Sequence, residues 1–166
     1  MADIQAQIQD TNHKRFLQHL EKSASAVWFV AMWFWGKGYT VTMPFITMAS
    51  GHEQWRDHAD NGDLEVLIGN ERKRVEVKHL GVCFTGREDW PFPDFIVCAK
   101  HSFDNAQPKP DYYIVLSNDK EAMGIVDTSY ASEWTTSRRT DSRYKGIDQD
   151  FYVCRPDRVI WRKANE

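Results

Sequence analysis

Residues 63–78 show the clearest alternation of hydrophobic and polar positions in the chain. Two runs that alternate with a period of two flank Gly69-Asn70, which is a turn signal, so this stretch predicts an antiparallel β-hairpin. Successive side chains of a strand point to opposite faces, and one face of this hairpin is therefore apolar while the other is charged. The apolar face carries Leu64, Val66, Ile68, Val75 and Val77, and the charged face carries Asp63, Glu65, Arg74, Glu76 and Lys78.

The register of the hairpin decides which charged residues lie directly opposite each other. A two-residue loop at Gly69-Asn70 pairs Asp63 with Glu76, whereas a loop centred on Asn70-Glu71 pairs Asp63 with Lys78. Both loops keep the three side chains on one surface, as direct or diagonal cross-strand neighbours. The pattern therefore predicts two carboxylates and an amine gathered on the face opposite the core.

Helical spacing precedes the hairpin. From about Asn12 to Trp35 the apolar residues recur at intervals of three and four, which predicts one long helix. The C-terminal half of this helix is apolar almost all round and should be buried against a sheet. Residues 1–11 are polar and are expected to be flexible or weakly helical. Residues 39–46 predict an edge strand.

Short apolar runs after the hairpin predict further strands. They cover Phe95–Ala99, Tyr112–Leu116, Met123–Val126 and a final hairpin of Phe151–Cys154 with Arg158–Trp161. A second helix is poorly marked, and the best places for it are after Ser117 or between Thr128 and Arg139. This order of elements indicates an α/β (α+β) fold, a mixed central sheet flanked by helices, in a single domain of residues 1–166.

Two carboxylates from adjacent strands are suited to a divalent cation. Mg²⁺ typically takes one or two carboxylates together with waters and substrate phosphate oxygens. Such a cation lowers the pKa of a bound water and neutralises charge on a phosphoryl group. A lysine nearby can orient the attacking water or stabilise the transition state. Asp63, Glu76 and Lys78 therefore predict metal-dependent hydrolysis of phosphodiester bonds.

Asp63, a gap of twelve residues and then Glu76-Val77-Lys78 at the end of an apolar strand resemble the motif of the PD-(D/E)XK nuclease superfamily. That superfamily includes restriction endonucleases, Holliday-junction resolvases and many phage and repair nucleases. The resemblance implies a restriction-endonuclease-like core, with Asp63 and Glu76 as ligands of Mg²⁺ or a substituting Mn²⁺. It also implies the Val77 carbonyl as a third ligand and Lys78 as the catalytic lysine. The chain departs from the motif at Gly62, where many relatives have proline.

Some members of the superfamily have an additional acidic metal ligand. Glu21 on the first helix and Glu53 in the loop before the hairpin are the two candidates here. Asp60 is an alternative to Asp63 if the first strand starts earlier. The scattered histidines lack the short fixed spacings of structural zinc ligands. This disfavours a zinc site built from His52, His58, Asp60 and His79.

Composition narrows the class of protein. Of the 166 residues, 42% are hydrophobic and 27% are charged, which is ordinary for a soluble globular domain. No apolar run is long enough to span a membrane, and the N-terminus lacks the basic and apolar regions of a secretion signal. Three widely spaced cysteines form no Cys-x-x-Cys pair. We expect a cytoplasmic protein, of a bacterial cell or a phage-infected host, with no membrane partner.

The charge of the chain bears on whether its partner is a nucleic acid. The net charge of −3 argues weakly against a surface coated with nucleic acid. Basic residues nevertheless gather at the predicted hairpin tip, in Arg72, Lys73 and Arg74, and again after Trp134. The resemblance implies DNA as the substrate. An RNA-directed nuclease and a non-catalytic binding or regulatory protein on the same scaffold, such as a phage or mobile-element factor, remain alternatives.

Aromatic residues suggest two further contacts. The first helix carries Trp28, Trp33 and Trp35, which favours core packing but also predicts a possible homodimer surface. The loop of Phe84 and Trp90-Pro91-Phe92-Pro93 follows the motif strand. It either covers the sheet, which is the favoured interpretation, or stacks on unpaired bases.

Overall fold

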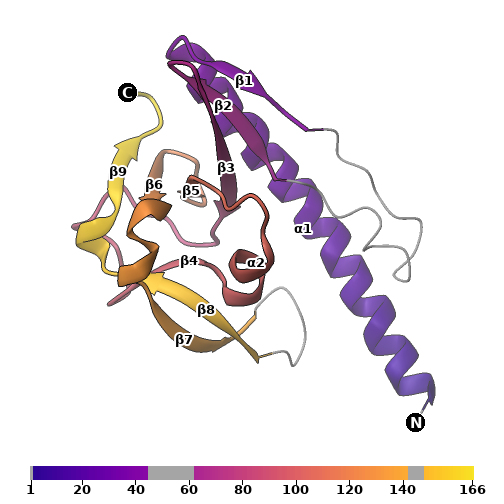
Figure 1. The fold of residues 1–166 in the computed structure, drawn as a ribbon. Helices are drawn as coiled ribbons and strands as arrows, with labels where there is room; N and C mark the ends of the chain where they lie inside the picture. Colours follow the sequence, from indigo (N-terminus) through magenta and orange to yellow (C-terminus); the bar gives the residue numbers. More distant parts are fainter. Residues whose placement is uncertain (1, 45–61, 142–147) are drawn as a thin grey trace.

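The structure is a computed structural model that describes residues 2–44, 62–141 and 148–166. One long helix, α1 (Ala2–Gly36), packs against a six-stranded sheet, and a second sheet of three strands lies below it (Figure 1). The larger sheet has the order β1 (Thr40–Thr42), β2 (Leu64–Ile68), β3 (Glu71–His79), β5 (Tyr112–Leu116), β6 (Ala122–Asp127) and β9 (Ile160–Lys163). The smaller sheet has the order β4 (Phe95–Ala99), β8 (Asp148–Cys154) and β7 (Thr135–Thr140). The remaining elements are α2 (Lys100–Asn105) and the 3₁₀ turns η2 (Thr128–Glu133) and η3 (Pro156–Arg158).

The larger sheet separates two apolar clusters. Strand side chains alternate between its faces, so Val75 and Val77 of β3 pack against α1, while Tyr113 and Val115 of β5 pack toward the smaller sheet. Both clusters consist of residues with almost no exposed area. Glu76 and Lys78, which alternate with Val75 and Val77 along β3, therefore point toward the side of the smaller sheet.

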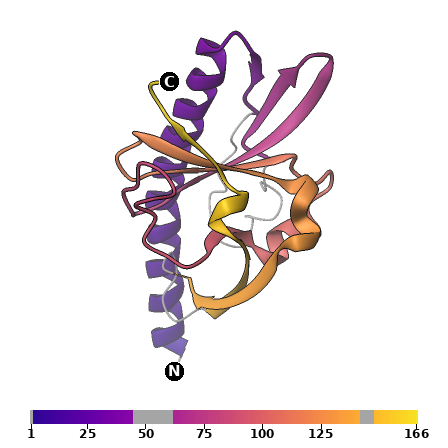
Figure 2. The ribbon, with the colours of Figure 1, turned by 90° about the vertical axis from the view of Figure 1, so that its left-hand side faces the viewer.

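Helix α1 begins at Ala2, well before the predicted start near Asn12. Its C-terminal half supplies the buried contacts, and its N-terminal half projects beyond the strands (Figures 1 and 2). The side chains of Trp28 and Trp35 are 59% and 67% exposed, whereas Trp33 is half-buried. The exposed pair remains available for contact with a second copy, and the homodimer stays a prediction.

The predicted hairpin is confirmed. Strands β2 and β3 pair antiparallel, with Leu64 opposite Val75 and Ile68 opposite Glu71, so Gly69-Asn70 forms the two-residue loop. Gly69 has a φ of 62°, the left-handed conformation that a type II′ hairpin turn needs at its first central residue. The first of the two registers considered from the sequence is therefore the one observed.

Two other predictions about the chain after the hairpin are wrong. The second helix is α2, in the connection between β3 and β5, rather than after Ser117 or between Thr128 and Arg139, where β6, η2 and β7 lie. Strands β8 and β9 do not form a hairpin: β8 pairs with β4 and β7, and β9 pairs with β6. The 3₁₀ turn η3 between them carries the chain from one sheet to the other, which a local turn signal cannot reveal.

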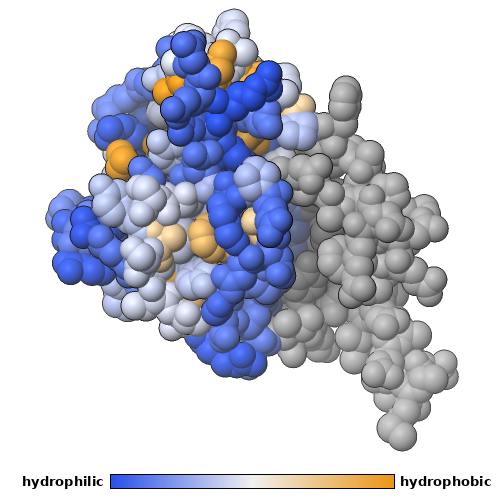
Figure 3. Space-filling view, in the orientation of Figure 1, coloured by the Kyte–Doolittle hydropathy of each residue, from blue (hydrophilic) through white to orange (hydrophobic). Residues whose placement is uncertain are grey.

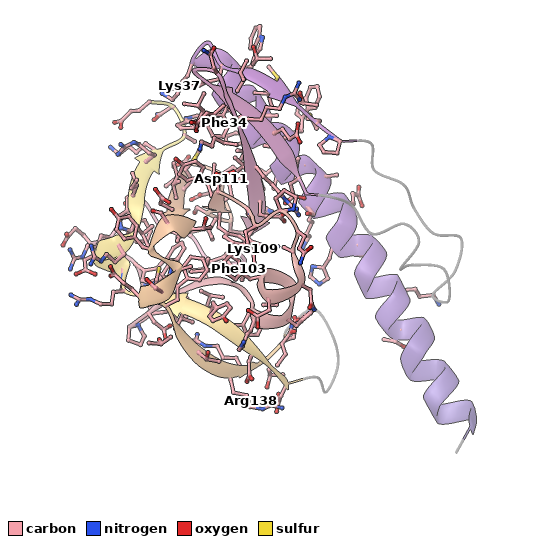
Figure 4. All side chains as sticks on the ribbon, in the orientation of Figure 1. Phe34, Lys37, Phe103, Lys109, Asp111 and Arg138 are labelled. Atoms are coloured by element: carbon pink, nitrogen blue, oxygen red, sulfur yellow. The ribbon has the colours of Figure 1, made fainter. Side chains whose placement is uncertain are left out.

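Strands β3 and β5 are the one parallel pair within the described sheets. Parallel neighbours need a crossover connection, and here residues 80–111 supply it with β4 and α2. The backbone N–H of Arg74 donates to Oδ2 of Asp111 at 2.8 Å, and the N–H of Asp111 donates to the carbonyl of Arg74 at 2.8 Å. Asp111 therefore fixes the start of β5 beside β3 (Figure 4).

Lys109 closes the C-terminal end of α2. Its ammonium donates to the carbonyls of Phe103 and Asp104, the latter at 2.7 Å, and lies 4.8 Å from the centre of the Phe103 ring (Figure 4). The carbonyls at a helix end have no partner within the helix, so a lysine there stabilises the end. This holds a six-residue helix in the crossover that leads to β5.

The fold is thus mixed α+β, with few helices and a mostly antiparallel larger sheet. This agrees with the predicted fold class at the level of a mixed sheet with helices. Among the described residues, no helix combines the length and the apolar character needed to cross a membrane.

We expect Gly124→Ala to destabilise the fold by about 1–3 kcal/mol, because overpacking a tight core forces neighbours out of place. A Cβ atom at Gly124 of β6 would lie 2.7 Å from Cζ of Phe95 and 2.9 Å from Cγ1 of Val159, both buried. Urea unfolding measures the change. Gly81→Ala is the matched control, since nothing lies within 4 Å of a Cβ there. Equal midpoints for the two variants would contradict the close packing of β4 on β6.

Candidate functional site

The charged face of the hairpin brings Asp63 opposite Glu76. Leu64 pairs with Val75, so the residue before Leu64 and the residue after Val75 face each other across the two strands. Oδ2 of Asp63 accepts a hydrogen bond of 2.7 Å from the backbone N–H of Val77. This bond fixes the Asp63 carboxylate beside the backbone that follows Glu76.

The Val77 carbonyl lies on the same side. The N–H and the C=O of one strand residue point in the same direction across the ladder. Since the Val77 N–H points toward Asp63, its carbonyl also points to the side of the strand where Asp63 lies. The Asp63 carboxylate and the Val77 carbonyl thus lie on the same side of β3, and both are oxygen groups of the kind that hard cations bind.

Glu76 already has a cationic partner, Arg74. Oε1 of Glu76 accepts from Nε of Arg74 at 3.3 Å and from Nη2 at 2.8 Å. The two side chains are only 16% and 15% exposed, which reduces screening by solvent. Nη1 of Arg74 also donates to the carbonyl of Pro108 at 2.9 Å, in the crossover. The guanidinium is therefore held against Glu76 from two elements.

The backbone conformation at position 62 and the nearby Arg74 side chain explain why this position is glycine rather than the proline of many superfamily members. Gly62 has a φ of 120°, which proline cannot adopt because its ring fixes φ near −65°. A Cβ atom at Gly62 would also lie 2.6 Å from Nε of Arg74. Gly62 therefore gives the Arg74 side chain the space in which it reaches Glu76.

Lys78 lies two residues beyond Glu76 on the same face and is partly buried. Cys98 of β4 and Tyr113 of β5 lie close to this face, and their side chains are hydrogen-bonded to each other. Burial raises the pKa of the Cys98 thiol to about 11; the Tyr113 bond and the Lys78 ammonium oppose this rise, while Glu76 adds to it. Burial likewise raises the pKa of Tyr113 well above its usual range. At neutral pH both groups are therefore uncharged beside Glu76 and Lys78.

Glu21, the one described candidate for an additional acidic ligand, is not brought to this face. Glu21 of α1 lines a hollow with His79 and Lys120, and its helix covers the face of the sheet opposite Glu76. Glu53 and Asp60 lie outside the described residues, as do His52 and His58. Among the described side chains, no three of the His, Cys, Asp and Glu type gather closely enough to hold a metal ion.

Most of the described basic residues at the hairpin tip and after Trp134 have acidic neighbours. Arg72 pairs with Glu65 at 3.1 Å, and the pattern recurs in both sheets. The other pairs are Lys73 with Glu71 and Asp111, Arg138 with Asp150, Arg139 with Asp94, Arg155 with Asp157, and Arg158 with Glu133. Arg143 and Lys145 lie outside the described residues. The described surface is hydrophilic over much of the view in Figure 3, but these pairs reduce its positive field.

The aromatic loop after the motif strand covers the sheet, as the favoured interpretation predicted. Phe84 and Trp90 belong to the cluster between the two sheets and are almost fully buried. The Trp90 indole N–H donates to the carbonyl of Asp94 at 3.0 Å. Phe92, with 40% exposure, is the member of this loop that could still contact a base.

Comparison with known proteins identified no relative of this chain. No family model, no curated protein and no solved structure matches the chain. The site therefore has to be judged by its own chemistry.

Sequence analysis did not single out Arg74 as the partner of Glu76 or Tyr113 as its neighbour. A signal for Arg74 was present, because residues two apart on one strand share a face.

Proposed function

We propose that this protein is a divalent-metal-dependent endonuclease of the PD-(D/E)XK type that hydrolyses phosphodiester bonds in DNA. The observation that carries the proposal is the position of Asp63 directly opposite Glu76, with the Asp63 carboxylate bound to the Val77 N–H at 2.7 Å. Lys78 lies on the same face of β3. Asp63, Glu76 and Lys78 are the residues that the motif implies, which supports the proposal.

The order of elements also supports the proposal. The superfamily core begins with a helix followed by three strands, and here α1 is followed by β1, β2 and β3. Among the described residues, the short helix α2 is the α-helix that follows β3. The second helix of the superfamily core also follows the motif strand. This order supports a restriction-endonuclease-like core with the motif at β2 and β3.

Asp63, Glu76 and the Val77 carbonyl would hold the cation, and their oxygen atoms fit the preference of Mg²⁺ or Mn²⁺. When bound, the cation supplies charge neutralisation at the phosphate and a more acidic water. The N–H of Val77 keeps Asp63 oriented before substrate arrives. Lys78 is placed to donate a hydrogen bond to the attacking water or to a phosphoryl oxygen as negative charge develops there. The Arg74 guanidinium has to leave Oε1 before Glu76 can bind a cation through that oxygen.

A non-catalytic binding protein on the same scaffold is the second candidate. The Arg74–Glu76 pair favours it, because a carboxylate that is permanently paired with an arginine has a structural rather than a catalytic role. The paired basic residues of the surface favour it as well, since a regulatory protein need not attract a polyanion. The two candidates differ in whether Glu76 binds metal.

We expect the purified protein to cleave plasmid or branched DNA in the presence of Mg²⁺ or Mn²⁺ and to leave it intact in EDTA. Parallel reactions with RNA of matched sequence determine whether DNA is the preferred substrate. Calorimetry with Mn²⁺ measures metal binding independently of cleavage. Metal binding with no cleavage of either nucleic acid would leave the endonuclease proposal without support, and absence of both would favour the binding protein.

A further inference from the structure

A hollow of about 630 Å³ lies between α1, the end of β3 and the turn after β5, away from the face that carries Glu76. The described residues that line it all have polar or charged side chains. The lining residues are Gln18, His19, Glu21, Lys22, Ser25, His79 and Lys120. A hollow of this size with several hydrogen-bond donors can hold a small polar group.

The charge of the lining favours an anion. Two lysines, Lys22 and Lys120, and one carboxylate, Glu21, line the hollow. The amide of Gln18 and the hydroxyl of Ser25 add donors that can point at oxygen atoms, whereas Nε2 of His79 lies 3.2 Å from the carbonyl of Asn118. Lysine ammonium groups are common ligands of phosphate, which they bind as point charges. A phosphate group therefore suits the hollow better than a cation or an apolar ligand.

Lys120 has a left-handed backbone conformation in the turn between β5 and β6. Its φ is 62°, and among the described residues it is the one non-glycine with a positive φ. A left-handed backbone at a long side chain costs about 1–3 kcal/mol, and glycine would adopt it without that cost. The backbone N–H of Lys120 closes the turn by donating to the carbonyl of Ser117 at 2.9 Å. Its ammonium donates to the hydroxyl of Ser25 on α1 at 2.6 Å, and both residues line the hollow.

The hollow lies next to the candidate catalytic strand. Strands β3 and β5 are parallel, so their carboxyl ends meet at the same edge, and His79 is the last residue of β3. Ligands of open α/β sheets bind outside the carboxyl ends of parallel strands. His79 follows Lys78 directly, with neighbouring Cα atoms about 3.8 Å apart. Their side chains point to opposite faces, so a chain that passes around the end of β3 would contact both.

We infer that this hollow binds a phosphate of the polynucleotide substrate, in a chain that passes around the end of β3 to the phosphate that is cleaved beside Glu76 and Lys78. The inference rests on the proposed function, to which it adds a substrate-positioning site. Lys22 and Lys120 are then positioning residues that hold the strand, whereas Lys78 acts on the reacting phosphate. Removing the two lysines weakens binding of substrate without changing the chemical step.

The test uses the double variant Lys22→Ala/Lys120→Gly, in which glycine retains the backbone conformation of the turn. Fluorescence anisotropy in EDTA measures binding of a labelled oligonucleotide, single-stranded and duplex, at several salt concentrations. We expect the double variant to bind about tenfold more weakly and the slope of log K against log salt to fall by about 1. In cleavage assays the KM rises and kcat is unchanged. Lys163→Ala, an exposed lysine of β9, is the matched control and binds as the wild type does.

The outcomes separate this inference from the nuclease proposal. Equal affinity and equal salt slope for wild type and double variant overturn the phosphate site, even if cleavage requires Lys78. A wild-type protein that binds no oligonucleotide overturns it as well. Binding that depends on the two lysines, in a protein that cleaves nothing, supports the site and removes the nuclease. Calorimetry with inorganic phosphate is the final arm: a phosphate signal lost in the double variant, without any loss of oligonucleotide binding, identifies a free-anion site and overturns the assignment to substrate.

Discussion

Asp63→Asn should reduce metal-dependent cleavage by about 10²–10⁴-fold while leaving the hairpin intact, and Lys78→Met should reduce kcat to a similar extent. Asparagine keeps a side-chain oxygen that accepts from the Val77 N–H, so the bond that orients residue 63 survives. It removes the negative charge that a divalent cation needs. Methionine keeps the aliphatic length of Lys78 and removes its ammonium. Single-turnover cleavage of a plasmid at saturating Mg²⁺ measures both effects.

Glu65→Gln is the matched control for these variants. Glu65 lies on the same charged face of the hairpin, one strand pair away, but its carboxylate forms an exposed ion pair with Arg72. Exposed pairs contribute little to stability, so this variant should fold and cleave as the wild type does. Thermal unfolding of all three variants verifies that lost activity is not lost fold. Full activity in Asp63→Asn and Lys78→Met would remove both residues from the mechanism and with them the superfamily assignment.

The part of the site that could be predicted from the sequence is its local part. A two-residue turn at Gly69-Asn70 and a period of two in the flanking strands fix both the register and the faces of a hairpin. Asp63 and Glu76 therefore fell opposite each other without any knowledge of the rest of the chain. The contact between Asp63 and the Val77 N–H follows from the same register.

Elements that depend on distant pairing could not be predicted in the same way. The runs of β8 and β9 are separated by a Pro-Asp turn signal, which is typical of a hairpin, yet their partners are β4, β7 and β6. The pairing of strands depends on which faces are buried against each other. Gly124 of β6, for example, leaves room for the ring of Phe95. Helix α2 has six residues, too few for a helical period to stand out.

The Arg74–Glu76 pair shows how a sequence pattern and a structure can emphasise different partners. From the sequence, Arg74 belonged to a basic cluster that could contact phosphates. In the structure its guanidinium is directed inward, onto Glu76 and the Pro108 carbonyl, over a glycine that leaves room for it. In the proposed enzyme, the Arg74 guanidinium therefore pairs with the Glu76 carboxylate until a metal ion binds.

Replacing Arg74 by methionine should therefore strengthen metal binding and weaken the metal-free fold. The hydrogen bonds from Arg74 to Glu76 are charged and mostly shielded from solvent, and such bonds contribute about 1.5–3 kcal/mol each at most. Without them Glu76 is left as a partly buried, unpaired carboxylate, so we expect the metal-free protein to lose about 1–3 kcal/mol. Because Mg²⁺ or Mn²⁺ no longer competes with the guanidinium, the Kd for the cation should fall about tenfold, which corresponds to about 1.4 kcal/mol.

Calorimetry with Mn²⁺ and thermal unfolding with and without the cation measure these two effects together. The cation should raise the Tm of Arg74→Met more than that of the wild type, since only the fold binds it tightly. Arg72→Met is the control, because the Arg72–Glu65 pair is exposed on both sides and lies nearer the turn. If Arg74→Met loses stability but gains no affinity for the cation, Glu76 is a structural partner of the arginine and not a metal ligand. The charged face would then belong to a binding protein, because a PD-(D/E)XK enzyme needs the second carboxylate to hold its metal.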